Sequence, residues 1–178
     1  MRALIFDTET TGLIENSSIP LEKQPHVIEF YGCVADLTTG EIGEEINQLI
    51  KAPVSVSAEI TRITGLTAED LKDSPPFEDV APAIKEIIET APVIIAHNLS
   101  FDKEMIDLEF QRLGKKIKWP DRLICTVEAT IHIKGHRFNL KRLHTELFGV
   151  AFADAHRAKN DVMALLSCCI ELYKRGEI

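Results

Sequence analysis

The stretch RALIFDTETTG (residues 2–12) combines a short apolar run with two acidic residues directly after it. Residues 2–7 have the length and composition of a buried β-strand. Because side chains alternate between the two faces of a strand, Asp7 and Glu9 continue the row of Ala3 and Ile5 on one face. The two carboxylates are therefore expected at the carboxyl end of a strand, the edge at which open α/β sheets bind ligands.

The remaining pattern predicts one α/β domain over residues 1–178. Strands are expected at 27–34 and near 42–50, which with the first strand form a meander, and again at 93–96 and 122–125. Helices are expected at 57–63, 67–71, 78–90, 100–113, 139–148 and 156–174. A meander followed by alternating strands and helices implies a mixed sheet with helices on both faces.

Composition excludes several classes of protein. A chain of 178 residues with 45% hydrophobic and 27% charged residues suits a folded globular domain rather than a disordered or fibrous protein. No apolar run approaches the roughly 20 residues of a membrane helix, and the amino terminus does not resemble a signal peptide, so we expect a cytoplasmic protein without a membrane association. The net charge of -8 disfavours a broad basic surface for long nucleic acid but is compatible with an acidic, cation-holding site.

Two further acidic residues interrupt apolar helical patterns. Asp102, in HNLSFD (97–102), follows a predicted strand and borders the inward face of its helix. Asp161, in HRAKND (156–161), lies within the apolar stripe of the last helix. Unpaired buried carboxylates are costly, and several together repel one another unless divalent cations neutralise them. An all-oxygen ligand set suits Mg²⁺ or Mn²⁺, so the sequence predicts a metal site formed by Asp7, Glu9, Asp102 and Asp161.

The motifs FDTETTG, HNLSFD and HRAKND, in this order, resemble those of the DEDDh (DnaQ-like) 3′-to-5′ exonuclease family, which includes the proofreading subunits of bacterial replicative polymerases. The resemblance covers residues 6 to about 172, and three motifs in order are far more specific than any one of them. It implies an α/β, RNase H-like fold with a five-stranded mixed sheet flanked by helices. It also implies that two divalent cations, Mg²⁺ or Mn²⁺, support hydrolysis of the terminal phosphodiester of DNA, with release of nucleoside 5′-monophosphates.

The resemblance further implies a role for each acidic residue. Asp7, Glu9 and Asp161 would hold the first metal, Asp7 would also hold the second, and Asp102 would act largely through water on the metal. His156 would be the general base that takes a proton from the attacking water. Five residues on one helix rotate by roughly 140°, so His156 must approach the metals from a loop or a frayed first turn.

Contacts to the substrate are also implied by the family motifs. Thr10 would contact the 3′-terminal nucleotide through its backbone, and Leu13 would wedge against the last base. Asn98 and Phe101 belong to the second motif and would steady the site or touch the substrate. The expected substrate is a single-stranded or frayed 3′ end.

Several alternatives remain open at the level of sequence. An RNA-trimming enzyme of the same family is one, although an aromatic content of 6% is low for an enzyme that stacks many bases. A non-catalytic accessory module is another, but such a module is expected to have lost an acid or the histidine. A DNA polymerase is a candidate partner, although the chain ends soon after its last helix, without the tail by which the family's proofreading subunit binds its polymerase.

Some residues have competing structural explanations. Asp102 would be favoured near a helix amino terminus by the helix dipole, whereas Asp161 is expected too far into its helix for that effect. His97 could be hydrogen-bonded within the fold or could contact substrate. The basic segment 134–142 could guide a phosphate backbone or be a solvated surface.

Overall fold

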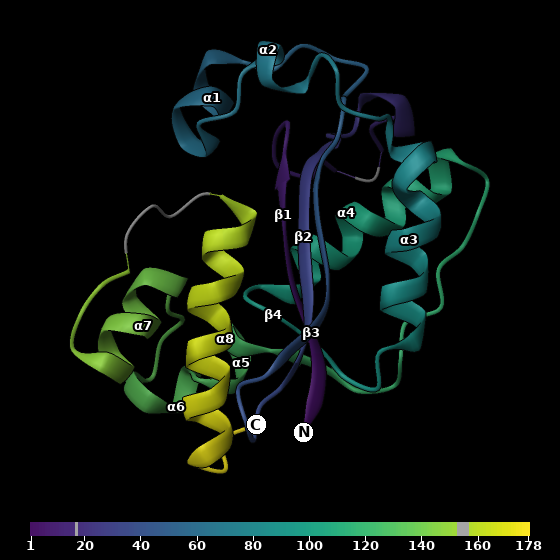
Figure 1. Ribbon diagram of the computed structural model, residues 1–178. Helices are drawn as coiled ribbons and strands as arrows, with labels where there is room; N and C mark the ends of the chain where they lie inside the picture. The colour runs from purple at the N-terminus through teal and green to yellow at the C-terminus, as the bar shows by residue number, and fades with distance from the viewer. Residues whose placement is uncertain (17, 153–156) are drawn as a thin grey trace.

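A five-stranded mixed sheet forms the centre of the molecule, in the strand order β3-β2-β1-β4-β5 (Figure 1). The computed structural model describes residues 1–16, 18–152 and 157–178. β1 is antiparallel to β2, and β2 is antiparallel to β3, whereas β1, β4 and β5 run parallel. The strands are β1 (Arg2–Thr10), β2 (Val27–Asp36), β3 (Ile42–Leu49), β4 (Ile94–Ala96) and β5 (Leu123–Cys125). The predicted five-stranded mixed sheet is confirmed.

Helices cover both faces of this sheet, as predicted. They are α1 (Ala58–Thr64), α2 (Ala68–Leu71), α3 (Phe77–Thr90), α4 (Leu99–Arg112), α5 (Thr126–Ala129), α6 (Ile131–Lys134), α7 (Leu140–Phe148) and α8 (Ala158–Lys174), with a 3-10 turn, η1, at Leu21–Lys23. The side chains of Ser57, Thr67 and Asn139 cap α1, α2 and α7. The sequence did not predict η1, α5 and α6, because elements of three or four residues are too short to show a helical period and these three lack the side-chain cap that marks the equally short α2.

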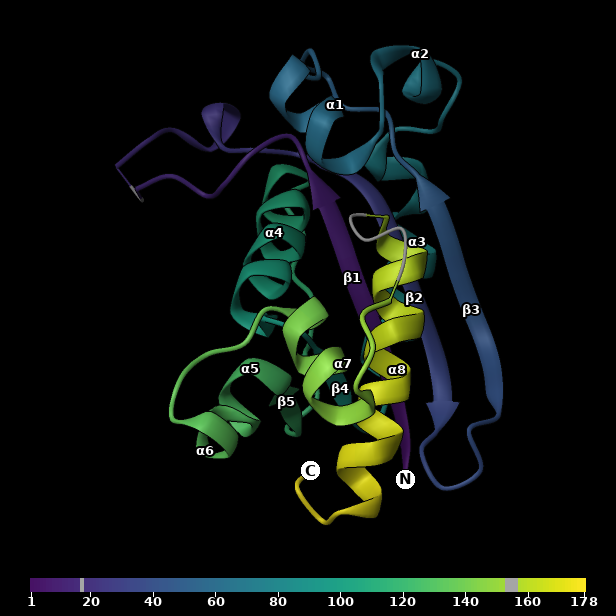
Figure 2. The ribbon, with the colours of Figure 1, turned by 90° about the vertical axis from the view of Figure 1, so that its left-hand side faces the viewer.

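Two layers of core side chains lie on opposite faces of β1. Leu4 and Phe6 face α3 and α4, whereas Ala3 and Ile5 face α8. All four are fully buried. Figure 2 shows β1 running between α4 and α8. The alternation of side chains on this one strand therefore decides which residues beyond Phe6 face α8.

Two helix starts differ from the sequence-based expectation. α4 begins at Leu99, one residue before the predicted start at residue 100, and Asn98 precedes it in a left-handed conformation with φ 70°. α8 begins at Ala158, after an extended Arg157, which places Asp161 in the first turn. The expectation that Asp161 lies too far into its helix to benefit from the helix dipole is therefore also wrong.

The short helices α1 and α2 lie beyond the carboxyl end of β1 (Figures 1 and 2). Leu66 and Leu71 anchor this segment on Ile28 of β2. The segment stands beside the end of the strand that carries the acidic motif, and it therefore contributes to the surroundings of the site. Among the helices in the described ranges, none has the length and apolar character needed to cross a bilayer.

Candidate active site

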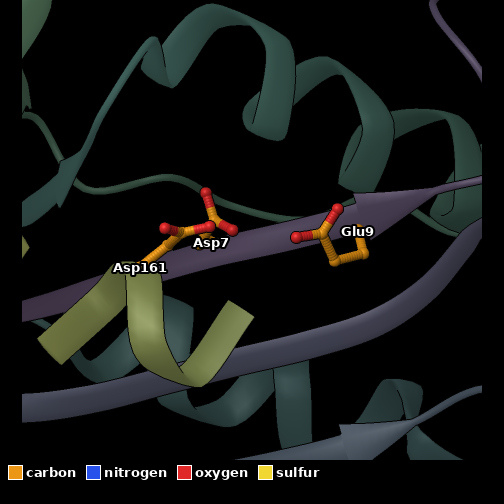
Figure 3. A group of neighbouring side chains, drawn as sticks. All are labelled: Asp7, Glu9 and Asp161. Carbon is orange, nitrogen blue, oxygen red and sulfur yellow. The ribbon is translucent and has the colours of Figure 1, made fainter. Parts of the chain in front are cut away.

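Three carboxylates from two elements converge beside the sheet. Asp7 and Glu9 extend from β1, and Asp161 reaches them from the first turn of α8 (Figure 3). Each offers one oxygen, and the three oxygens lie within 4.8 Å of one another. All three side chains are half-buried. The alternation predicted for β1 thus holds, and it aims Asp7 and Glu9 at the helix that carries Asp161.

The fourth acid of the predicted set, Asp102, lies in the first turn of α4 and is 3% exposed. Its Oδ1 accepts two hydrogen bonds from Thr8, one from the backbone N at 3.0 Å and one from Oγ1 at 2.7 Å. Asp102 is not a member of the three-carboxylate group. Thr8 lies between Asp7 and Glu9 in the sequence, so its hydrogen bonds tie Asp102 directly to the strand that carries them.

Burial and mutual repulsion raise the pKa values of these acids. Burial first, and then the charges of Asp102, Glu9 and Asp161, raise the pKa of Asp7 well above its usual range. Burial and the neighbouring Asp161 raise the pKa of Glu9 to about 8. Burial raises the pKa of Asp102 to about 7, although the hydrogen bonds from Thr8 act in the opposite direction.

These properties fit a divalent cation. Carboxylate oxygens are the ligands preferred by hard cations such as Mg²⁺. The three oxygens lie within 4.8 Å of one another, and burial raises the pKa of Asp7 and of Glu9. A bound cation would offset the repulsion among the three carboxylates and would favour their deprotonated forms. Asp7, Glu9 and Asp161 could therefore hold metal directly, as the sequence predicts.

His97 has a structural role in this fold. Its Nδ1 lies 2.9 Å from Oγ1 of Thr126 and its Nε2 lies 3.1 Å from the carbonyl oxygen of Phe138. Burial lowers the pKa of the imidazole to about 4, so the ring is neutral at pH 7. Both ring nitrogens are engaged, and His97 links the end of β4 to α5 and to the segment before α7.

A pocket of about 550 Å³ adjoins the acidic group. Glu9 and Thr10 line it from β1, Leu13 lines it from the following loop, and Phe101 lines it from α4. The side chain of Leu13 is 79% exposed. The structure thus brings together three of the four predicted substrate-contact residues. Asn98 is exposed and does not line this pocket, and its predicted contact stays a prediction.

Helix α1 supplies a wall of this pocket that the sequence analysis missed. Ile60 and Ile63 face it, and Ile63 is 38% exposed. The presence of Ile60 and Ile63 in a short predicted helix was the signal in the sequence that could have indicated an apolar wall. That signal is weak, because single exposed apolar residues are common on protein surfaces.

The predicted general base, His156, lies outside the described residues. The basic segment 134–142 has much of its charge paired, since Lys134 contacts Glu146 and Arg137 contacts Glu128. These ion pairs favour the solvated-surface explanation of that segment over a track for phosphates.

Comparison with known proteins identifies the family. The family described as exonuclease matches residues 4–168. The chain is 28% identical to the DNA polymerase III subunit epsilon of Buchnera aphidicola subsp. Schizaphis graminum over 177 residues, covering 99% of this chain and 72% of that protein. It is 30% identical to the epsilon subunit of Haemophilus influenzae over 141 residues, covering 79% of this chain and 53% of that one. A PolC-type DNA polymerase III of Caldanaerobacter subterraneus subsp. tengcongensis is 30% identical over 174 residues, covering 97% of this chain and 12% of that protein.

Solved structures share the fold. The nuclease domain of 3′hExo, described as a DEDDh family member bound to rAMP, has a TM-score of 0.77 at 16% identity, covering 98% of this chain and 92% of that one. Exonuclease X in complex with 5′ overhanging duplex DNA has a TM-score of 0.69 at 21% identity, covering 98% and 93%. These likenesses confirm the RNase H-like fold. The family match over residues 4–168 establishes that the chain belongs to the exonuclease family, and its three motifs resemble those of the DEDDh, DnaQ-like group of 3′-to-5′ exonucleases.

Proposed function

We propose that this protein hydrolyses the terminal phosphodiester bond at DNA 3′ ends and releases nucleoside 5′-monophosphates by a two-metal mechanism. The observation that carries the proposal is the convergence of Asp7, Glu9 and Asp161 within 4.8 Å, on a group that shares Glu9 with the adjoining pocket. A nucleotide held in that pocket would have its phosphodiester beside the acidic group.

The acidic residues divide the work of holding the cations. Asp7, Glu9 and Asp161 would hold Mg²⁺ or Mn²⁺, with Asp7 shared between two ions. Such cations, when bound, neutralise charge on the phosphodiester and make an attacking water easier to deprotonate. Asp102 would act from farther out, held in place by the two hydrogen bonds from Thr8.

The chain's own side chains would orient the substrate and move the proton. Leu13, Ile63 and Phe101 give the pocket apolar surfaces on which any base can pack, so sequence-independent removal of nucleotides is expected. A volume of about 550 Å³ lies within the range of pockets for a single small ligand, which favours one unpaired nucleotide at a time. His156 would take the proton from the attacking water.

DNA is the proposed substrate because the relatives at 28–30% identity are named as DNA polymerase III proteins. The same names support a DNA polymerase as a partner and the cytoplasm as the site of action. The complete acid set, with His156, supports an enzyme over a non-catalytic accessory module.

One digestion experiment tests the proposal. DNA and RNA oligonucleotides of one sequence, labelled at the 5′ end, would be incubated with the protein and Mg²⁺, Mn²⁺ or EDTA. We expect a ladder of 5′-labelled DNA fragments shortened from the 3′ end, slower shortening of RNA, and no cleavage in EDTA. Faster cleavage of RNA would overturn the DNA assignment, cleavage in EDTA would overturn the metal mechanism, and intact oligonucleotides under all conditions would overturn the enzymatic function.

A further inference from the structure

A fifth acid, Glu29, is buried beside the candidate active site but is not part of its metal-holding group. Glu29 lies on β2, is 1% exposed, and is the direct cross-strand partner of Glu9 on β1. Partners in an antiparallel pair project from the same face of the sheet, so Glu29 faces α8 as Asp7 and Glu9 do. A buried acid next to three others needs a specific reason, because each added negative charge opposes ionisation of its neighbours.

Both carboxylate oxygens of Glu29 are engaged by the start of α8. Arg157 donates from Nε to Oε2 at 3.2 Å and from Nη2 to Oε1 at 2.9 Å. The backbone N of Ala158 donates to Oε2 at 3.1 Å. Two hydrogen bonds from one guanidinium fix both its orientation and its distance relative to the carboxylate, whereas a single contact fixes the distance alone.

The backbone hydrogen bond completes the amino terminus of α8. Arg157 occupies the N-cap position, and its own side chain does not cap the helix. Ala158 is the first residue of the helix, so its N–H has no acceptor within the helix and Glu29 supplies one. A negative charge at this end is also favoured by the helix dipole.

We propose that Glu29 and Arg157, here called the β2–α8 clamp, are positioning residues that hold the first turn of α8 against the sheet so that Asp161 meets Asp7 and Glu9. Asp161 is three residues after Ala158, and its backbone N donates to the carbonyl oxygen of Arg157 at 3.0 Å. The clamp is therefore joined to the metal-holding group by one helical turn.

The charge of Arg157 gives the clamp a second effect. The clamp places a cation beside the acids of the site, because Arg157 is paired with Glu29, the cross-strand partner of Glu9.

The test measures Mn²⁺ binding by titration calorimetry and, separately, the kcat and KM of nucleotide release. The variants are Glu29→Gln, Arg157→Met and Arg157→Lys, with Glu171→Gln as matched control, because Glu171 forms an ion pair with Arg175 at the far end of the same helix. We expect the Mn²⁺ dissociation constant to rise about 10- to 100-fold in Glu29→Gln and Arg157→Met, the usual effect of losing a residue that orients a metal ligand. We expect kcat to fall with KM for the oligonucleotide unchanged, Arg157→Lys to recover part of the loss, and Glu171→Gln to match the wild type.

The inference rests on the proposed function, but the two can fail separately. Mn²⁺ affinity and kcat within twofold of the wild type in folded Glu29→Gln would overturn the clamp while leaving the exonuclease intact. A wild type that binds Mn²⁺ more tightly than Glu29→Gln does, but that releases no nucleotide, would overturn the proposed function and support the clamp. If Glu29→Gln does not fold, the neutral pair Glu29→Gln with Arg157→Met decides, and an unchanged Mn²⁺ affinity in that protein contradicts the inference.

Discussion

Asp7 and Glu9 follow four fully buried apolar residues on β1, and this position determines their chemistry. The same strand that buries Ala3 and Ile5 against α8 presents the two acids to Asp161. Their raised pKa values mean that the metal-free protein carries these groups at a cost in stability. A site that destabilises the fold until its ligand binds is common among functional sites.

The pKa of Glu9 leads to a prediction about stability. Its folded value of about 8 lies above its unfolded value, so the folded state holds more protons and the free energy of unfolding falls as pH rises toward 8. The pKa of His97 is lowered to about 4 in the folded state, so this residue makes the free energy of unfolding rise with pH, but only below its unfolded pKa of about 6.5. Between pH 6.5 and 8 the buried acids therefore determine how the free energy of unfolding changes with pH.

In metal-free buffer, Glu9→Gln should melt at a higher temperature than the wild type at pH 8, with the gap narrowing as pH falls to 6.5. Thermal unfolding followed by circular dichroism at several pH values measures this difference. A gap that does not change with pH would contradict the assigned pKa.

Thr8 offers a second prediction at this scale. Its hydrogen bonds favour the ionised form of Asp102, so Thr8→Val should cost more stability above pH 7 than below it. The expected loss above pH 7 is about 1.5–3 kcal/mol, the usual value for a hydrogen bond to a charged group. Denaturant unfolding at pH 5.5 and pH 8.5 measures it.

Thr130→Val is the control, because the buried Thr130 hydroxyl donates to a backbone carbonyl oxygen rather than to an acid. Its cost should not depend on pH, and nucleotide release should be slower only in Thr8→Val. Equal pH dependence in the two variants would argue against the role of Thr8.

Helix α1 contributes none of the three metal-holding acids, yet it forms one wall of the pocket. The side chain of Ile63 is 38% exposed there, and removing its apolar surface should weaken binding of the terminal nucleotide without altering the acids. We expect Ile63→Ser to raise KM about fivefold, equivalent to about 1 kcal/mol of lost apolar contact, with kcat unchanged.

Ile42→Ser is the matched control for that variant, since Ile42 on β3 is 36% exposed and does not line the pocket. It should leave KM at the wild-type value. A similar rise in KM for both variants, or a fall in kcat with constant KM for Ile63→Ser, would remove α1 from the substrate pocket.

Elements with strong local patterns were predictable from the sequence, and those fixed by distant contacts were not. The apolar run of β1 and the helices expected at 67–71 and 139–148 match the structure, in which side chains of Thr67 and Asn139 cap the starts of α2 and α7. The start of α8 was misplaced because its first turn is set by Glu29, 129 residues before Ala158. Glu29 itself stands in a strand of buried residues and gives no local signal that it would meet an arginine.

Part of the candidate site was likewise predictable from the sequence, and part was not. The acids were predictable because carboxylates contradict an apolar pattern, and three motifs in order identify their family. The α1 wall and the Thr8–Asp102 bonds depend on how separate elements pack, which no periodicity in the sequence records.

At the scale of the whole molecule, two cores share one strand. Leu4 and Phe6 belong to the core under α3 and α4, and Ala3 and Ile5 belong to the core under α8. Unfolding of β1 would therefore disrupt both cores at once. We therefore propose that the chain folds as one domain and expect a single unfolding transition. Fluorescence of Trp119, which packs on the first core, and far-UV circular dichroism should give the same midpoint. Two separate midpoints would contradict the single domain.

The acidic group and the adjoining pocket support the proposal that Asp7, Glu9 and Asp161 hold cations that drive removal of 3′-terminal nucleotides. The most direct measurement is release of mononucleotides from a single-stranded DNA by the wild type and by Asp7→Asn, at saturating Mg²⁺, with circular dichroism to establish that both are folded. Asn keeps the size of Asp7 but removes the charge, so we predict a loss of at least about a thousandfold, or about 4 kcal/mol of transition-state stabilisation. A folded Asp7→Asn protein that releases nucleotides at the wild-type rate would contradict the claim.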